Sequence, residues 1–471
     1  MATSLPRNNC LHYYTSWKGA LRHEFLQHYW SKLIAGLIVE IQVAAVASEL
    51  EIACLRCDNL QRCQRFAGFY VTSRLNPAVD KSGGTITILL MIMTLVVFLI
   101  TGMFLSVLPL HLQMRLGQSN FIIGSITGLQ FIVALGSRIF AGTYTDRHGP
   151  KSAVIIGLIM AIASGGFSLA SLGLLGNPLA SVVVLAVGRG LLGGGECFAL
   201  VGAVSWAMGV MGRQVAGSAI SRIGMAMYVG LAAGAPIGSI LYNSYGFAFV
   251  GLASILLPTL ALLAILPLLA LQPEKQEGGA FWLVLRAVWE PGLGLSFASL
   301  GYGATITFSI LLFTERGWQP AWAALTIFAV AFILARLLLG HLPDRIGGAR
   351  VAQIFAILQM TGLALMALSP SAVLGFASSA LAGFGYSLVY PGVGLEAVQR
   401  APPANRGLAI GVYTAFLELT LGIVSPLLGL LAGWVGLGAV FMVSALCTSG
   451  TILIATLLRA NPMTTLEPEP R

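Results

Sequence analysis

An acidic and a basic residue lie seven positions apart in an apolar segment, Arg189-Gly-Leu-Leu-Gly193-Gly-Gly195-Glu196. Seven residues are about two turns of an α-helix, so both side chains project from one face. A charge at membrane depth is costly and usually marks a functional site. A carboxylate there can exchange a proton as its surroundings alternate between wet and dry. The pair predicts Glu196 as a proton carrier that Arg189 tunes; the alternative is a contact that only packs helices together.

Glu418 is a further acid inside an apolar segment, Ala-Phe-Leu-Glu-Leu-Thr. It is the second candidate for a proton carrier, on the same argument from the cost of burying a charge. A purely structural contact explains it equally well. Glu396 and Arg222 lie near the ends of apolar segments, where long side chains reach the membrane surface.

The composition defines the elements that position these residues. Of the 471 residues, 57% are hydrophobic and only 9% are charged, too few for a water-soluble surface. The apolar runs are far longer than barrel strands and are long enough to cross a bilayer as helices. The sequence therefore predicts an all-α integral membrane protein.

From Ile86 onward the chain predicts twelve membrane spans joined mostly by short loops. We place them at 86–110, 121–143, 152–175, 179–206, 217–242, 246–271, 293–313, 321–341, 351–368, 371–396, 406–432 and 437–458. The one polar linker, 272–291, lies midway, and its second part around Arg286 predicts a helix lying in the membrane interface.

One pattern of charged and small residues occurs twice, each time at the end of an apolar segment. It consists of Arg138, Gly142, Asp146, Arg147 and Gly149 in the first copy, and Arg336, Gly340, Asp344, Arg345 and Gly347 in the second. Two copies at equivalent places indicate a duplicated membrane unit. The pattern resembles the signature loop between helices 2 and 3 of the major facilitator superfamily, although Pro150 stands where that family usually has arginine.

The duplication extends beyond the signature. Gly193-Gly-Gly195-Glu196 matches Gly383-Phe-Gly385-Tyr386, and at the same offset Pro236 matches Pro426 and Tyr228 takes the place of Glu418. The offset between the signature copies is larger, which predicts a longer connection between spans three and four than between spans nine and ten. The resemblance covers roughly residues 86–460, and we expect two six-helix bundles, 86–271 and 292–460, followed by a tail, 461–471.

The resemblance implies the superfamily fold, in which twelve helices form two pseudo-symmetric bundles that rock around a midplane site. It also implies that Asp146 binds the start of a neighbouring helix and closes the cytoplasmic side. Arg138 and Arg336 lie two turns before the two aspartates, and we interpret them as structural gate pairs. The predicted gating set is Asp146, Arg147, Arg138, Asp344, Arg345 and Arg336. In span four the resemblance connects Arg189 with proton coupling.

Aromatic and polar residues in the spans are candidates for binding a substrate. They are Gln130, Trp206, Tyr302, Thr305, Tyr386 and Tyr390. Aromatic and amide groups suit a sugar or a drug-like compound of mixed polarity. The sequence predicts no metal site and no cofactor.

Basic residues gather in alternate loops, which fixes the expected orientation. Arg147, Lys151, Arg345 and Arg350 are among those on one side, whereas the opposite loops hold only Arg115 and Arg316. Both termini are therefore expected in the cytoplasm, and the chain in a bacterial-type inner membrane. The formal charge of +9 is explained by this asymmetry and by anionic headgroups rather than by nucleic acid. We expect a monomer.

Residues 1–80 differ from the body of the chain. They hold four of the six cysteines, and their apolar stretch 33–48 is short and interrupted by Glu40. We interpret them as a peripheral extension or a misplaced start of the reading frame, and we expect residues 1–70 to be dispensable for insertion and transport. Cys54-x-x-Cys57 lacks the further ligands of a zinc site.

We conclude from the sequence that this is a secondary transporter and not an enzyme, because no nucleotide-binding or hydrolytic motif occurs. Gly230-Leu-Ala-Ala-Gly234-Ala-Pro236 resembles the span-five motif of antiporters and favours proton-coupled efflux, as in arabinose- or drug-efflux-like permeases. Two alternatives remain: a proton-linked importer of a sugar or organic acid, and a non-transporting membrane sensor of the same fold.

Overall fold

The computed structural model describes residues 77–460, with gaps at 212–215, 269, 272–280 and 403–404. Most of the predicted extension 1–80, the first part of the linker 272–291 and the tail 461–471 lie outside the described residues, so those boundaries stay predictions. The described residues from 82 onward belong to one compact unit.

Every regular element in the described ranges is a helix, which confirms the all-α membrane fold. The first half contains α4 (Pro77–Met114), α5 (Asn120–His148), α6 (Pro150–Leu172), α7 (Pro178–Met211), α8 (Ala216–Tyr245) and α9 (Phe247–Ile265). The second half contains α10 (Phe281–Glu315), α11 (Ala323–Leu339), α12 (Leu342–Ile346), α13 (Gly348–Leu368), α14 (Ala372–Arg400), α15 (Arg406–Val435) and α16 (Leu437–Ala460). Eleven of them are long and apolar enough to cross a membrane, and α11 is a shorter apolar helix at the eighth predicted span. The arrangement agrees with twelve membrane helices.

The predicted interfacial helix around Arg286 is not a separate element. It is the first part of α10, which continues without a break through Pro291 into the seventh span. Proline is tolerated inside a membrane helix because neighbouring groups can satisfy the carbonyl that it leaves free. Within this part Val284 and Val288 are buried while Trp282 and Trp289 are exposed, so the segment is amphipathic as predicted.

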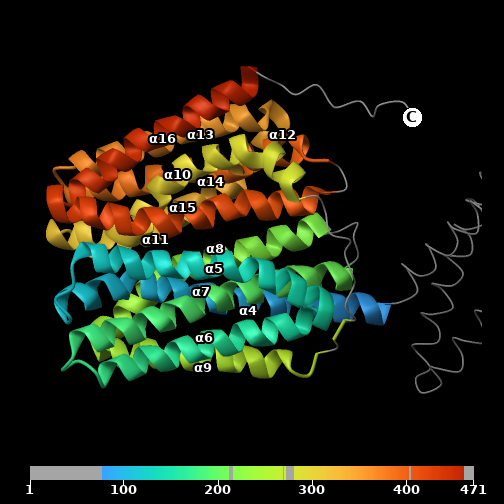
Figure 1. The fold of residues 1–471 in the computed structure, drawn as a ribbon, viewed down its shortest axis with the longest axis horizontal. Coiled ribbons are helices and arrows are strands. Elements are labelled where there is room, and N and C mark those ends of the chain that lie inside the picture. Colours follow the sequence, from blue (N-terminus) through green and yellow to red (C-terminus); the bar gives the residue numbers. More distant parts are fainter. Residues whose placement is uncertain (1–76, 212–215, 269, 272–280, 403–404, 461–471) are drawn as a thin grey trace, which may run out of the picture. The chain divides into compact units, whose positions relative to one another are not determined.

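The two halves meet along two pairs of helices. Figure 1 shows α5 and α8 of the first half beside α15 and α11 of the second, and the helix contacts agree with it. In each half the third helix packs closely on the fourth, as α6 on α7 and α13 on α14. The connection from α6 to α7 covers 173–177 and that from α13 to α14 only 369–371, which confirms the predicted longer connection in the first half.

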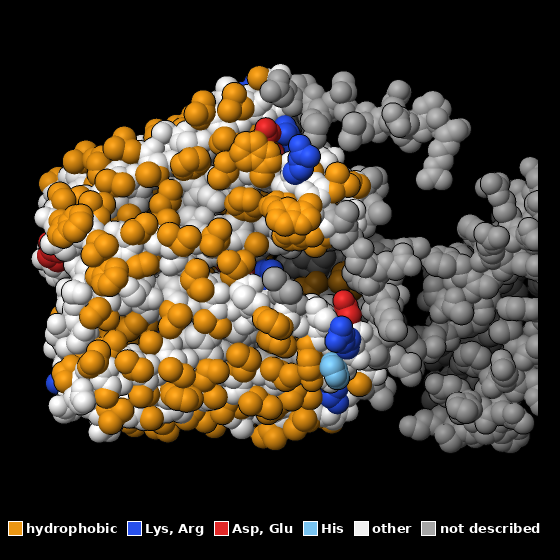
Figure 2. All heavy atoms as spheres, viewed as in Figure 1, with side chains coloured by type: hydrophobic (Ala, Val, Ile, Leu, Met, Phe, Trp, Pro, Cys, Tyr) orange, Lys and Arg blue, Asp and Glu red, His pale blue; other side chains and the backbone are white. Residues whose placement is uncertain are grey.

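The helices α5 and α15 pack backbone to backbone at one end of the bundle, whereas the halves are separated at the other. Near the start of α5, a methyl group on Gly124 would collide with the carbonyl of Ser425, and one on Gly128 with the carbonyl of Gly422. Such close backbone contact leaves no passage between α5 and α15 there. At the opposite end, where the charged side chains gather, Figure 2 shows a hollow between the two halves.

The two signature loops turn on glycines with positive φ. Gly149 has a φ of 86° and Gly347 a φ of 90°, a region that favours glycine because it lacks a Cβ. The copies differ before this turn. In the first copy α5 continues through Asp146, whereas in the second α11 ends at Leu339 and Pro343 begins the short α12. Proline cannot donate a backbone hydrogen bond to continue the helix.

Candidate functional site

The close packing of α7 on α5 places the charged residues of span four beside an amide. A methyl group on Gly193 would collide with the backbone carbonyl of Gln130, so this position must be glycine for the two helices to meet. Arg189 lies one turn before this contact and Glu196 nearly one turn after it. Both face α5, as the seven-residue spacing predicts.

Gln130 joins the two charged residues. Its Oε1 accepts a hydrogen bond from Nη2 of Arg189, and its Nε2 donates to Oε1 of Glu196 at 2.8 Å. Thr101 of α4 donates its hydroxyl to the same oxygen of Glu196. Side-chain contacts thus run from α4 through α7 to α5, and among the described residues no direct ion pair links Arg189 to Glu196. The amide of Gln130 thus contacts both charged groups at once.

This network is almost completely enclosed. Gln130 is 0% exposed, Arg189 1% and Glu196 8%. The guanidinium of Arg189 lies over the ring of Phe104, with its carbon 5.1 Å from the ring centroid. Its Nε and Nη1 have no hydrogen-bond partner in the described part of the chain. An arginine held mainly by one amide and one aromatic face is free to take a further partner.

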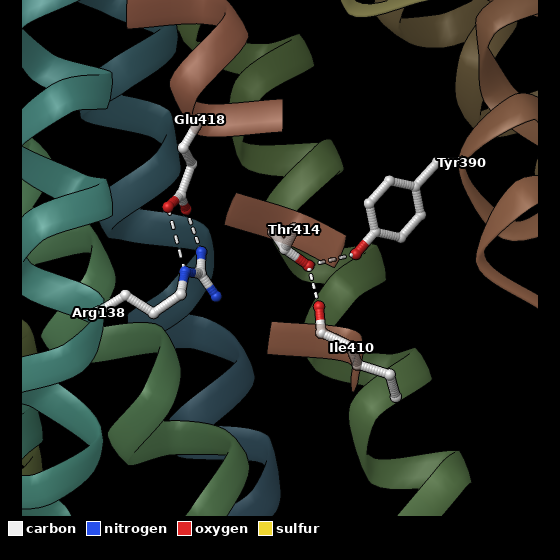
Figure 3. A network of polar contacts seen from close by, with 5 residues as sticks. All are labelled: Arg138, Tyr390, Ile410, Thr414 and Glu418. Atoms are coloured by element: carbon white, nitrogen blue, oxygen red, sulfur yellow. Dashed lines mark hydrogen bonds and ion pairs between the residues drawn. The ribbon is translucent and has the colours of Figure 1, made fainter. Parts of the chain in front are cut away.

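The second buried acid forms an ion pair across the two halves. Arg138 of α5 donates from Nε to Oε2 of Glu418 at 3.1 Å, and its Nη2 contacts Oε1 of the same carboxylate (Figure 3). The expected pairing of Arg138 with Asp146 is wrong in this conformation, because the acid of α15 lies closer to the guanidinium. A bidentate arginine–carboxylate pair is among the stronger polar contacts.

Hydroxyl groups extend the polar surface beyond Glu418. Thr414, one turn earlier on α15, is 2.9 Å from the hydroxyl of Tyr390 and donates to the carbonyl of Ile410 (Figure 3). Tyr413 donates its hydroxyl to the backbone carbonyl of Tyr390 at 2.8 Å. Tyr390, a predicted binding residue, is thus fixed between α14 and α15 and remains half-buried.

Aromatic rings dominate the corresponding part of the second half. Tyr302 of α10 stacks on Tyr386 of α14, with ring centroids 4.8 Å apart and planes 8° apart. Tyr302 also contacts Phe328 of α11, and Phe332 contacts Tyr386. Two of the three tyrosines that the sequence singled out therefore pack together as one aromatic wall.

Two other predicted binding residues are enclosed in helix packing. Trp206 is 0% exposed and belongs to a core cluster with Leu90 and Met93, and its indole nitrogen has no partner in the described part of the chain. Thr305 is also 0% exposed and donates its hydroxyl to the carbonyl of Gly301 at 2.9 Å. Their binding roles stay predictions.

The predicted gating residues of the two signature loops differ in their exposure. Asp146 is half-buried, Arg147 is exposed, and among the described residues no acid–base contact involves either of them. Burial raises the pKa of Asp146 above its usual value. Asp344 and Arg345 are both exposed on α12. Because helix α11 ends before Gly340, Arg336 and Asp344 lie on different helices and do not share one helix face, contrary to expectation.

Arg336 instead lies against aromatic rings. Its guanidinium carbon is 5.4 Å from the ring centroid of Tyr228 in α8 and 5.7 Å from that of Phe332. Across the described chain it has no ion-pair or hydrogen-bond partner. The contact with Tyr228 spans the two halves, as the pair of Arg138 and Glu418 does.

Sequence reasoning missed several participants. Thr101 carries no signal, since a single threonine in an apolar span is common. Thr414 lies four residues before Glu418, a spacing that places both on one helix face and could have identified it. Glu396 does more than reach the surface, because its carboxylate accepts the backbone N–H of Ala349 at the start of α13.

Comparisons with known proteins agree with this architecture. The family model described as Major Facilitator Superfamily matches residues 90–393 and 292–471. An uncharacterized MFS-type transporter of Salmonella typhimurium is 39% identical over 365 residues, covering 77% of this chain and 94% of its own length. The uncharacterized MFS-type transporter YhhS of Escherichia coli is 35% identical, covering 78% and 90%.

Solved structures match the fold over nearly their whole length. The xylose transporter XylE from E. coli, in a partially occluded inward open conformation, has a TM-score of 0.65 at 14% identity, over 83% of this chain and 100% of that one. The nucleoside transporter NupG (D323A mutant) has a TM-score of 0.64 at 16% identity, over 80% and 99%. At these identities the likeness concerns the fold alone.

Proposed function

We propose that this chain, which belongs to the Major Facilitator Superfamily, exports a sugar or drug-like compound from the cell in exchange for protons. It is a membrane transporter of small molecules, and its relatives imply transport rather than enzymatic catalysis. Export and the proton are our proposal, as are the inner membrane with both termini in the cytoplasm and the monomeric state.

Contacts at the two ends of the bundle support alternating access. The helices α5 and α15 pack backbone to backbone where α5 begins, the halves are separated at the signature loops, and basic residues favour the cytoplasm for the latter end. The structure then corresponds to an inward-facing state. Rocking of the halves would close the signature end and bring Asp146 to the positive start of a neighbouring helix.

The enclosure of Glu196 is the observation that carries the proton assignment. Its Oε1 receives donors from both Thr101 and Gln130, and Arg189 reaches it only through the amide. Protonation of the carboxylate would remove the negative charge that this amide relays to Arg189. A substrate that donates hydrogen bonds to the same carboxylate would need it deprotonated, so proton and substrate would compete for Glu196.

The packing of α8 supports an antiporter-like fifth span. Methyl groups on Gly230 and Gly234 would collide with the carbonyls of Leu95 and Leu99, so α8 packs backbone to backbone on α4. Pro236 follows inside the same helix. Close packing beside Thr101 allows movement of α8 to affect the hydroxyl that binds Glu196.

The test is substrate flux in proteoliposomes, with a substrate found by a toxicity screen of deletion and overexpression strains. When a proton gradient is imposed, the native protein should use it to accumulate substrate, and Glu196→Gln should lose this accumulation. Exchange of labelled for unlabelled substrate without a gradient should persist in Glu196→Gln. Full gradient-driven accumulation in Glu196→Gln, with loss in Glu418→Gln, would mean that Glu418 on α15 carries the proton. Accumulation only in the direction of import would refute export.

A further inference from the structure

Among the described residues, the interior of the spans carries one positive charge that no acid balances. Its charged residues, in the described part of the chain, are Arg138, Arg189, Arg336, Glu196 and Glu418. Three arginines face two glutamates. Arg138 is paired with Glu418, and Arg189 is connected to Glu196 through Gln130. Arg336 is the cation without a counterpart.

The internal duplication shows what is missing beside Arg336. Arg336 is the counterpart of Arg138 in the second signature copy. Tyr228 is the counterpart of Glu418 at the offset that also relates Pro236 to Pro426. The structure keeps both encounters, since α5 packs on α15 and α8 on α11. In one encounter an arginine meets a carboxylate, and in the other an arginine meets only aromatic faces. Arg336 therefore faces aromatic rings where Arg138 faces a carboxylate, and among the described residues no acid pairs with its guanidinium.

The surroundings of Arg336 suit an organic anion better than an ion alone. Tyr228 contacts Phe332 at 4.2 Å between ring centroids, and Phe332 leads to Tyr386 and its stacked partner Tyr302. Tyr228, Arg336 and Tyr302 are half-buried and lie at or beside the contact between the two halves. The guanidinium can bind a carboxylate through two hydrogen bonds, and the rings offer an apolar surface to the rest of the molecule.

We propose that the substrate is an organic carboxylate, held by Arg336 at the position that Glu418 occupies beside Arg138, with its body along the wall of Tyr228, Phe332 and Tyr386. This inference rests on the proposed transport function, because it names the class of compound that the transporter would carry. A neutral sugar would leave Arg336 without a counter-charge. An organic cation would be repelled by it.

The experiment measures binding of matched acids and amides to the purified full-length protein. Benzoate and benzamide, 3-phenylpropionate and its amide, and propionate and its amide are titrated while tryptophan fluorescence and thermal unfolding are followed. At least one carboxylate should bind about tenfold more tightly than its amide, because a charged bidentate contact is lost in the amide. Arg336→Gln should abolish this preference.

Tyr228→Glu is the more specific variant, because it places a carboxylate beside Arg336 as Glu418 lies beside Arg138. Its carboxylate should occupy Arg336 and remove the preference for the acid by about the same tenfold factor. Tyr228→Gln has nearly the same shape as Tyr228→Glu without the charge; it should weaken acid and amide alike, because it removes a ring of the wall, and keep the ratio between them. Retention of the preference in Arg336→Gln, or its absence from every matched pair in the native protein, would overturn the proposal.

Proton movement separates this inference from the proposed function. The same acids are added to proteoliposomes that contain a pH-sensitive dye. Binding of a carboxylate through Arg336 without any proton flux would support the inference and refute proton coupling. Proton-driven transport of a neutral compound, with no preference for any acid, would refute the inference and leave proton coupling intact.

Discussion

The two halves share a backbone contact but surround it with opposite chemistry. In the first half Gly193 lies against the carbonyl of Gln130, and in the second Gly383 lies in the same way against the carbonyl of Phe328. Next to the first contact stands Glu196; next to the second, at the same offset, stands Tyr386. The duplicated scaffold thus holds an enclosed polar network on one side and an aromatic stack on the other.

This difference suggests that the first half binds the proton and the second half binds the substrate. The hydrogen-bonded carboxylate of the first half is suited to holding a proton, because each contact of Thr101 and Gln130 depends on its charge. The stacked rings of Tyr302 and Tyr386 have no charge to exchange and offer a surface for a substrate. The ion pair of Arg138 and Glu418 joins the halves, so changes on one side can reach the other.

The largest difference between the halves is expected at the signature aspartates. Asp146→Asn should reduce turnover by up to about 30-fold, since a charge at a partly buried helix end is worth up to about 2 kcal/mol and the gate must close in every cycle. Asp344→Asn should retain most of the turnover, because Asp344 is exposed on the separate helix α12. Turnover in proteoliposomes, with membrane insertion as control, measures both. Equal losses in the two variants would contradict the comparison.

Asp146 should also make turnover depend on pH. Because burial raises the pKa of Asp146, its carboxylate gains a proton at a higher pH than an ordinary aspartate does. Acidification on the signature side should therefore begin to slow the native protein before ordinary aspartates titrate. Asp146→Asn should lack this phase of inhibition. An identical acid limb in the two proteins would exclude Asp146 as its source.

The ion pair between the halves should produce the next largest effect. Glu418→Gln leaves the guanidinium of Arg138 unpaired, with its side chain 24% exposed, and should lower stability by about 2 kcal/mol. Thermal unfolding in detergent measures this loss. The reversed pair Arg138→Glu with Glu418→Arg should recover part of it. Glu290→Gln is the matched control inside one half: Glu290 is 43% exposed in its pair with Arg400, so we expect a change below about 1 kcal/mol.

The sequence predicted the fold well because its signals are strong and local. Apolar length and two copies of one pattern sufficed for twelve helices in two halves, and seven-residue spacing correctly placed Arg189 and Glu196 on one face of α7. Those signals depend on periodicity within a single helix. The site was harder to predict because its partners come from different helices.

The pairs that cross between helices could not be read from spacing. Arg138 selects Glu418, which is 280 residues away, over Asp146 on its own helix. Gln130 was expected to face a substrate but bridges two charges, and Thr101 had no signal at all. The break at Gly340 could have been inferred from Pro343, but the similarity to the first signature suggested one continuous helix face from Arg336 to Asp344.

The aromatic side of the comparison should tolerate change better than the polar side. Tyr386→Phe keeps the stack on Tyr302 and removes only a 3.4 Å contact with the hydroxyl of Ser299. We expect a loss of stability below about 1 kcal/mol, the usual net value of one hydrogen bond. Gln130→Leu has a similar volume and should cost more, because it removes the hydrogen bond of Arg189 and one of the two donors to Glu196. Thermal unfolding of the two variants compares them directly, and a larger loss in Tyr386→Phe would reverse the assignment.

The smallest expected effect concerns the ends of helices next to the signature loops, where the halves again use opposite charges. In the first half Lys151 donates Nζ to the carbonyls of Leu266 and Leu268, at 2.7 and 2.6 Å, just beyond the end of α9. In the second half the carboxylate of Glu396 accepts the N–H of Ala349 at 3.1 Å, in the first turn of α13. A cation at a helix C-terminus and an anion at an N-terminus are each worth about 0.3 to 1 kcal/mol when partly exposed.

Lys151→Met and Glu396→Gln should therefore each lower stability by about 0.5 kcal/mol, while Lys151→Arg, which keeps the charge, should lose less than Lys151→Met. High salt should shrink these losses, because exposed charges are screened. Thermal unfolding at low and high ionic strength measures this. If either neutral variant lost several kcal/mol and its loss were insensitive to salt, the contact would be part of the packed core rather than a helix-end interaction. The opposite charges at the two loops would then reflect packing and not the helix dipole.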